Sequence, residues 1–442
     1  MRSKRLILVV TVLLAAMLFI AGCGNKKASN GNEATDSRKA YAGTTINVLL
    51  KTGYEAEAVK AYVDDFEKET GIEVKYEVYD EPTMRNKFIL DSTSKTGNYD
   101  VVSTQFWYMP EYLRAGWLEP LNEYQADKEW NAVKNIPEGL IKTYSDNDDK
   151  LYAVPVSVTG GVLVYRQDLL DKYNLKAPET TEDVLAIAEE LVKKGEDAYP
   201  FIGRGDSSSA SFGTSVGWAW AYGARVLDDQ GKVTVNTPEM RQAMNDFVKL
   251  MGEYGPPDQA GIGWDVMSEM YRQGKVAMNF DMSGFPSVYA NPEVSSVADK
   301  LGVSVLKGPA GNYAQWLYGE GLGVSKFSKN KEAAWLFVQW RTSYDVAMQE
   351  VQDGIRFDFP DTRVSESDEY KEKTKGLEFF TSQLPEILGS VDASYWPNVP
   401  EFEKVAEAFQ KQISLAISGK QSVDKALDKA QQDIEKIMTE SK

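Results

Sequence analysis

A regular alternation of strand-like and helix-like segments over residues 44–104 is the feature that most constrains how this chain can fold. Strand-like runs cover 44–50, 72–79 and 99–104, and helical spacing marks the stretches between them at 59–66 and 83–93. A β-α-β-α-β order predicts an α/β fold with a parallel sheet and right-handed crossovers. In such sheets, ligands bind beyond the carboxyl ends of the strands. The loops at 51–54 and 105–108 are therefore candidate parts of a binding site.

The same alternation resumes after residue 151. Its clearest segments are strands at 162–165 and 275–280 and helices at 181–194, from 237 onwards and at 423–437. Thr237 and Pro238 form a typical helix start, because the threonine hydroxyl can cap the first turn and proline needs no amide hydrogen there. The pattern predicts two α/β lobes of similar size with a ligand in the crevice between them.

The amino terminus predicts export. Three basic residues, Arg2, Lys4 and Arg5, precede an uncharged stretch from 6 to 20, and small residues follow. This arrangement is typical of a removed signal peptide, here residues 1–22. The apolar stretch is short for a transmembrane helix, which needs about 20 apolar residues.

The motif IAGC at 20–23 resembles the bacterial lipobox. That resemblance implies cleavage before Cys23, a diacylglycerol lipid on its sulfur, and palmitate-type acylation of the new amino terminus. An ordinary signal peptide with an incidental cysteine is the alternative. Residues 24–43 are polar and lack apolar periodicity, so residues 23–43 are expected to form a flexible linker.

Composition and charge exclude several classes of protein. Cys23 is the only cysteine, so no disulfide can form within the chain, and the absence of histidine excludes Ser-His-Asp catalysis and the commonest zinc sites. We expect neither a metal nor a cofactor. The net charge of −17 disfavours nucleic acids and anionic lipid surfaces as partners.

Seven short motifs, in five groups, then occur in a fixed order. They are YDVV at 99–102 with AGWLEPL at 115–121, YAVP at 152–155 with LVYRQDLL at 163–170, GKVAM at 274–278, KEAAW at 331–335, and GKQSVDKAL at 419–427. In this order the chain resembles family 1 extracellular solute-binding proteins, the relatives of maltose-binding protein, over residues 44–436. Residues 354–363 depart from the family pattern, which leaves a ligand role for Arg356 or Asp358 open.

The resemblance implies a two-lobe, type II periplasmic-binding-protein fold with a ligand cleft between lobes joined by a hinge. Residues 44–155 and about 320–350 are expected to form lobe 1, and about 156–319 and 351–442 lobe 2. It also implies a monomer that binds a carbohydrate, with an oligosaccharide as the expected form, and delivers it by hinge closure to the transmembrane subunits of an ABC permease. The resemblance further implies that the protein lies on the extracellular or periplasmic side of the membrane and is held there by the lipid alone.

Candidate ligand contacts come from the resemblance and from position in the chain. By resemblance, Lys51, Thr52, Gln105 and Trp107 fall on ligand loops of the first lobe. By position next to strands, turns or glycines, the further candidates are Thr159, Trp218, Trp220, Asp281, Phe285, Trp316 and Trp396. Aromatic rings suit the apolar face of a sugar, and Asp281 is expected to accept hydrogen bonds from two sugar hydroxyls.

Three alternatives stay open. The same fold could bind another polar metabolite, such as a phosphorylated polyol, although an anion calls for a cluster of cations. An exported glycosidase needs only two carboxylates, and nothing in the placement of the acids selects a pair. The protein could also report to a sensor kinase instead of a permease.

Overall fold

The computed structural model describes residues 37–440 except 125 and 132. The predicted signal peptide, Cys23 and most of the predicted linker lie outside the described residues. The linker was expected to reach residue 43, but a 3-10 helix spans Ser37–Tyr41. Arg38 in this turn pairs with the carboxylates of Glu69, Asp127 and Glu129 and covers the ring of Trp130. These contacts fix the 3-10 helix to the folded body. The sequence around residues 37–41 looks like a linker because the residues that contact Arg38 are distant in the chain.

The first sheet has five strands in the order β2-β1-β3-β9-β4. The strands are β1 Thr45–Lys51, β2 Glu73–Tyr79, β3 Val101–Gln105, β4 Ala153–Thr159 and β9 Tyr318–Val324. The three strands predicted from residues 44–104 pair in parallel, as expected. Strand β9 runs antiparallel to both β3 and β4, so the complete sheet is mixed.

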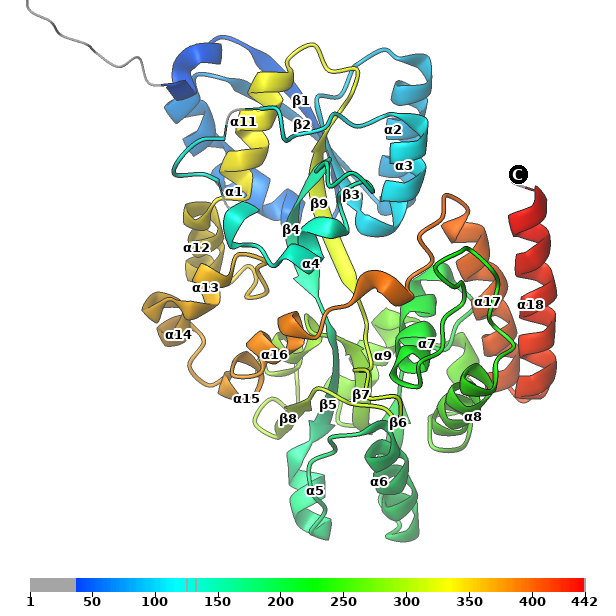
Figure 1. Cartoon of the computed structure of the whole chain (residues 1–442). Coiled ribbons are helices and arrows are strands. Elements are labelled where there is room, and N and C mark those ends of the chain that lie inside the picture. The colour runs from blue at the N-terminus through cyan, green and yellow to red at the C-terminus, as the bar shows by residue number, and fades with distance from the viewer. Residues whose placement is uncertain (1–36, 125, 132, 441–442) are drawn as a thin grey trace, which may run out of the picture. The chain divides into compact units, whose positions relative to one another are not determined.

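The second sheet has four strands in the order β6-β7-β5-β8. The strands are β5 Gly161–Arg166, β6 Tyr199–Ile202, β7 Val276–Met282 and β8 Leu301–Ser304. Only Gly160 separates β4 of the first sheet from β5 of the second, so the chain passes directly from one sheet to the other (Figure 1). Gly160 and Ser283 hydrogen-bond each other at this crossing, which ties it to the end of β7.

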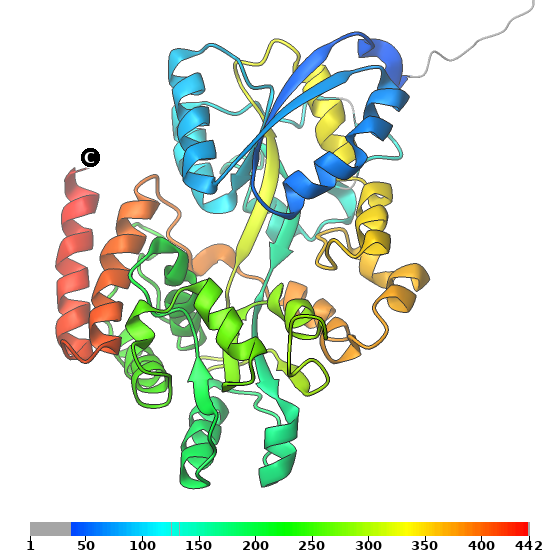
Figure 2. The ribbon, with the colours of Figure 1, turned by 180° about the vertical axis from the view of Figure 1, so that it is seen from behind.

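Helices cover both sheets. Around the first sheet lie α1 Tyr54–Thr70, α2 Glu81–Ser94, α3 Met109–Ala115, α4 Glu138–Lys142 and α11 Lys331–Arg341. Figures 1 and 2 show α1 and α11 on one face of this sheet and α2 and α3 on the other. The second sheet is accompanied by α5 Gln167–Tyr173, α6 Thr181–Lys193, α7 Ser209–Ala221, α8 Pro238–Glu253, α9 Trp264–Arg272, α10 Phe285–Tyr289, α17 Phe402–Ile417 and α18 Val423–Glu440.

The remaining helices form one continuous stretch of the chain after α11. They are α12 Tyr344–Asp353, α13 Thr362–Glu366, α14 Asp368–Lys373, α15 Glu378–Thr381 and α16 Leu384–Gly389. Local sequence explains several helix starts, such as the Thr180–Asp183 capping box of α6 and the Thr237 cap before Pro238 in α8. In the described part of the chain, no helix combines the length and apolar character needed to span a lipid bilayer.

Candidate ligand-binding site

A polar cluster lies where β1 and β3 end and β9 begins. Lys51 is the last residue of β1, and its Nζ donates to the Tyr318 hydroxyl at 2.6 Å and lies 3.6 Å from the Glu320 carboxylate. Ser103 donates to the other oxygen of Glu320 at 2.8 Å. Ammonium, hydroxyl and carboxylate groups therefore meet at the edge of the sheet where polar ligands of α/β lobes bind.

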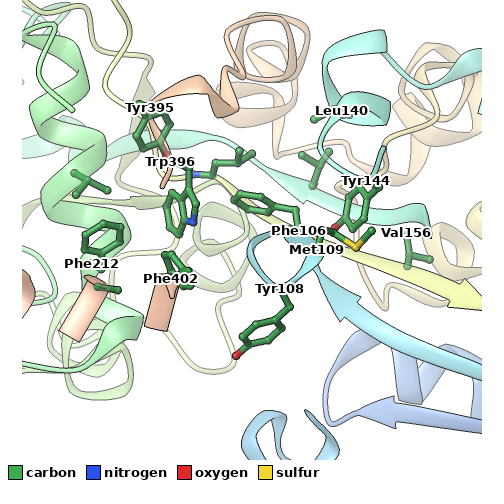
Figure 3. Packing of buried hydrophobic residues seen from close by; sticks show 14 of the residues in the cluster. Phe106, Tyr108, Met109, Leu140, Tyr144, Val156, Phe212, Tyr395, Trp396 and Phe402 are labelled. Carbon is green, nitrogen blue, oxygen red and sulfur yellow. The ribbon is translucent and has the colours of Figure 1, made fainter. Parts of the chain in front are cut away.

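Aromatic rings from distant parts of the chain pack beside this cluster. Trp107 stacks on Trp396 with ring centroids 5.8 Å apart, and it lies 5.6 Å from the ring of Tyr318. Phe106 and Phe402 also contact the Trp396 ring, at 5.3 and 5.4 Å (Figure 3). The segment that leads into α17 is thereby packed against the turn after β3.

Three buried polar side chains near these rings lack a well-formed hydrogen bond to any described residue. They are the Gln105 amide, which lies near the Tyr318 hydroxyl, the Thr159 hydroxyl and the Trp396 indole N–H. Thr159 faces Tyr318 across the sheet register. Buried polar groups normally find partners, so this region has hydrogen-bonding capacity that a polar ligand could use.

Asp281 has a different partner from the one expected. Both carboxylate oxygens accept from the Arg204 guanidinium, at 2.7 and 2.8 Å, and the Met282 amide donates to one of them. Burial raises the pKa of Asp281, and the Arg204 charge opposes that rise. Arg204 also lies over the Trp316 ring at 4.4 Å, while the Trp316 indole N–H donates to Thr214. In this conformation Asp281 serves a buried ion pair that fixes Trp316, and its oxygens are engaged by the protein.

A pocket of about 420 Å³ opens between the start of α1, the α10 region and the loop that follows α12. Its polar lining consists of Tyr54, Ser283, Ser287, Asn291, Arg356 and Asp358, and its apolar lining includes Val288, Phe357, Leu377 and Phe380. The volume lies in the lower part of the range for small-molecule sites, about 300–1,000 Å³. Apolar surface with a few convergent polar groups is the usual make-up of such a site.

Within the described part of the chain, the formal charges that line this pocket are one positive and one negative. Arg356 and Asp358 are the two charged residues among the described residues that line it. Burial raises the pKa of Asp358 to about 6, although the neighbouring Arg356 lowers it. Partial desolvation, reinforced by Asp358, also raises the pKa of Tyr54, although the residue is 52% exposed and Arg356 opposes the rise.

Substitution of Asp358 by asparagine is expected to change how stability depends on pH. The folded pKa of about 6 exceeds the ordinary value of 3.8, so the stability linked to this carboxyl group is fully present below pH 3.8 and is lost as the pH rises through about 6. The wild type should therefore lose melting temperature relative to Asp358→Asn between pH 4 and 7. Thermal unfolding without ligand measures this, with the exposed Asp368→Asn as control. Parallel curves for wild type and Asp358→Asn would contradict the prediction.

The structure brings some of the predicted site residues together and separates others. Lys51, Gln105, Trp107, Thr159 and Trp396 lie around the polar and aromatic clusters at the end of the first sheet. Thr52 is exposed, and its backbone amide donates to the Tyr79 carbonyl.

The candidates from the helices around the second sheet are more dispersed. Trp218 is fully buried among Phe201, Phe247 and Phe280, because α7 is buried over most of its length. Trp220 is only partly buried; it stacks on Tyr395, 5.9 Å away, and packs against the same core. Phe285 stacks on Tyr289, and it directly follows Gly284 of the 420 Å³ pocket. None of the eleven candidate ligand contacts lines this pocket.

Several residues of the pocket and its surroundings were not among the candidates. Tyr54 and Ser283 lie within segments that the sequence singles out, one in the loop after the first strand and one just after Asp281. Arg356 and Asp358 fall in the segment that departs from the family pattern, so the resemblance could not assign them. Arg204 follows β6, and no local sequence pattern predicts that it pairs with Asp281, which lies 77 positions away. Within the described residues, no group of three potential ligands could hold a metal ion.

Comparison with known proteins gives a consistent result. Residues 52–348 match the model of a family described as bacterial extracellular solute-binding protein. A mannitol-binding protein from Pseudomonas aeruginosa is 26% identical, over 84% of this chain and 88% of that protein.

Solved structures agree with this. An ABC transporter solute-binding protein from Agrobacterium vitis with bound D-mannitol is similar at a TM-score of 0.76 and 26% identity, covering 90% of this chain and 99% of that one. A maltose-bound protein from T. maritima has a TM-score of 0.75 at 23% identity, covering 89% of this chain and 100% of that one, which shows a shared fold.

Proposed function

Because this chain belongs to the family of bacterial extracellular solute-binding proteins, we propose that it captures a small, neutral, polyhydroxylated solute, a polyol or a sugar, for an ABC importer. Its architecture is the two-lobe, type II periplasmic-binding-protein fold that the sequence predicts. The observation that carries the proposed ligand class is the 420 Å³ pocket with its uncharged hydroxyl and amide groups and its single pair of opposite charges.

The chemistry of the pocket suits a polyhydroxylated ligand. Hydroxyl groups both donate and accept hydrogen bonds, and Tyr54, Ser283, Ser287 and Asn291 offer the same dual capacity. The apolar lining matches the C–H surface of such a molecule. The mannitol bound by relatives at 26% identity supports this ligand class. The size of the pocket favours a polyol or a monosaccharide over the oligosaccharide expected from sequence.

The charges of the pocket argue against a phosphorylated polyol. A phosphate monoester carries about −1.5 to −2 charges near neutral pH. Arg356 is the one cation among the lining residues, and Asp358 beside it would repel an anion. A neutral ligand meets no such penalty.

Capture is proposed to proceed by hinge closure. Tyr54 begins the helix that follows β1 of the first sheet, whereas Ser283 and Ser287 follow β7 of the second. A ligand that touches both groups stabilises the arrangement in which they are close, and it shifts the population toward that state. The closed protein, as a monomer, would then present its ligand to the transmembrane subunits of the permease.

The anchor is part of the proposal. The lipobox-like motif at 20–23 supports a lipid on Cys23, and the polar stretch after it supports a tether between the membrane and the folded body. Mass spectrometry of the membrane fraction tests this, since Cys23→Ser should abolish the lipid and release the protein from membranes.

Isothermal titration of the protein without its signal peptide tests the ligand. We expect D-mannitol, ribitol or a monosaccharide such as D-glucose to bind with a micromolar Kd, corresponding to about −8 kcal/mol. Mannitol 1-phosphate should bind at least tenfold more weakly than mannitol. Arg356→Met should weaken binding about 10- to 100-fold, as for loss of a hydrogen bond to a charged group worth about 1.5–3 kcal/mol.

The exposed Lys193→Met in α6 serves as the control and should leave Kd unchanged. Preference for the phosphorylated compound, or binding of amino acids and none of the neutral polyols and sugars, would overturn the proposed ligand class.

A further inference from the structure

Four buried charged side chains form a continuous chain behind the pocket. Arg341, at the end of α11, has its Nε 2.9 Å from the Glu55 carboxylate, and its Nη1 donates to Glu350 of α12 at 2.8 Å. The other oxygen of Glu350 accepts from Nε of Arg356 at 3.0 Å. The order of the chain is thus Glu55, Arg341, Glu350, Arg356, with alternating charge.

This arrangement is costly to bury. All four residues are at most 6% exposed, and Glu350 is fully buried. Desolvation raises the pKa of Glu55 to about 7, even though Arg341 lowers it. Buried ion pairs add little net stability compared with apolar residues of similar volume. These four charged residues are therefore not explained by their contribution to stability, and their position next to the pocket suggests another role.

The first and last residues of this series of buried charges, Glu55 and Arg356, lie at two walls of the pocket. Glu55 immediately follows Tyr54, which lines the pocket from α1. Arg356 itself lines the pocket from the loop after α12. Arg356 also donates through Nη2 to the Val156 carbonyl at 2.6 Å, and Val156 belongs to β4, the strand that passes into the second sheet.

The contacts of Arg356 leave part of its guanidinium available. Nε is engaged by Glu350 and Nη2 by Val156, whereas Nη1 has no hydrogen-bond partner among the residues that the structure describes. An arginine is a rigid planar fork, so two fixed nitrogens determine where the third one lies. Glu350 is the side chain that fixes one of those two.

We propose that Glu350 and Arg341 are positioning residues of the ligand pocket: Glu350 orients Arg356 toward a ligand hydroxyl, and Arg341 ties that arginine to the helix that presents Tyr54. The inference rests on the function proposed above and assigns a role to two side chains that line no part of the pocket. Arg356 then contacts the neutral polyol or sugar, and the buried chain of charges sets the spacing between the two walls.

A double-mutant cycle measured by isothermal titration with D-mannitol, ribitol and D-glucose tests this inference. Glu350→Gln should weaken binding at least tenfold in the wild-type background. In an Arg356→Met background, the same change should alter Kd by less than twofold, because Glu350 acts through Arg356. Equal losses in both backgrounds would show that Glu350 affects binding independently of Arg356, and they would overturn the inference.

Two further variants keep the test decisive. Asp100→Asn removes another buried carboxylate of the first lobe, one that binds Asn47 and Ser328 and no pocket residue; it should lower the melting temperature and leave Kd unchanged. If Glu350→Gln does not fold, Arg341→Lys replaces it, since lysine keeps the charge but cannot bridge two carboxylates as a fork. An unchanged Kd in Arg341→Lys would overturn the inference. If the wild type binds none of the three probes, the proposed ligand class fails and the inference fails with it.

Discussion

Asp281→Ala is expected to lower the free energy of unfolding by about 3–5 kcal/mol, because it leaves the Arg204 guanidinium buried without its counter-ion. The side chains of Arg204 and Asp281 are only 4% and 1% exposed, so the guanidinium left without its partner stays shielded from bulk solvent. The same change releases Arg204 from its position over Trp316. Urea unfolding followed by tryptophan fluorescence measures the loss.

Two controls separate the orphaned charge from loss of packing. Arg204→Met combined with Asp281→Leu removes both charges at similar volume and should recover most of the stability lost in Asp281→Ala. Asp229→Ala breaks an exposed pair with Arg225 and should cost less than about 1 kcal/mol. A double variant as unstable as Asp281→Ala would show that the ion pair itself, and not the orphaned charge, supports this region.

Gly217→Ala is expected to destabilise the protein by about 3 kcal/mol or more, at or above the upper end of the range for overpacked cores. A Cβ at this position of α7 would overlap the backbone carbonyl of Gln315. The Gln315 amide donates to the Gly217 carbonyl at 3.1 Å, so the two backbones are held in contact and cannot separate without losing that bond. Thermal and urea unfolding measure the loss.

Gly139→Ala in α4 is the matched control. This glycine is also helical, but it is exposed, and apart from its chain neighbours and the nearby backbone of its own helix, no atom of the described residues lies within 4 Å of the place that an alanine methyl group would take. Alanine there should stabilise the helix by about 0.5–1 kcal/mol through its lower conformational entropy in the unfolded chain. A Gly217→Ala protein as stable as Gly139→Ala would contradict the close approach of α7 to residue 315.

Gly217 and Gly213 also illustrate what the sequence could not predict, namely which residues contact them. The stretch around Trp218 is rich in small residues, which predicts a close approach of some group to the backbone. The structure shows that the Gln315 backbone approaches at Gly217 and the Trp316 ring at Gly213. Small residues signal contact, but they do not identify the partner, because the partner is about 100 positions away in the chain.

Asp281 gives a second example. Its place just past an apolar strand leads to the expectation of a ligand contact, and the structure shows a buried carboxylate at the end of β7 that pairs with Arg204. Whether such a carboxylate meets a ligand or a guanidinium depends on what the end of β6 presents, and Arg204 lies there. The pocket residues Arg356 and Asp358 likewise come from a loop whose sequence matches no motif, and their neighbours come from α1 and α10.

The sequence by itself determined the α/β class, the parallel order of β1, β2 and β3, and the family, because strand and helix periodicity and short motifs are local properties of the chain. It also predicted candidate binding loops beyond the carboxyl ends of the strands. Only the tertiary structure decided which of them share a pocket and which neutralise one another. Those outcomes depend on contacts between residues far apart in sequence. A buried polar group needs a partner, and only the tertiary structure determines whether another residue supplies that partner or leaves it to a ligand.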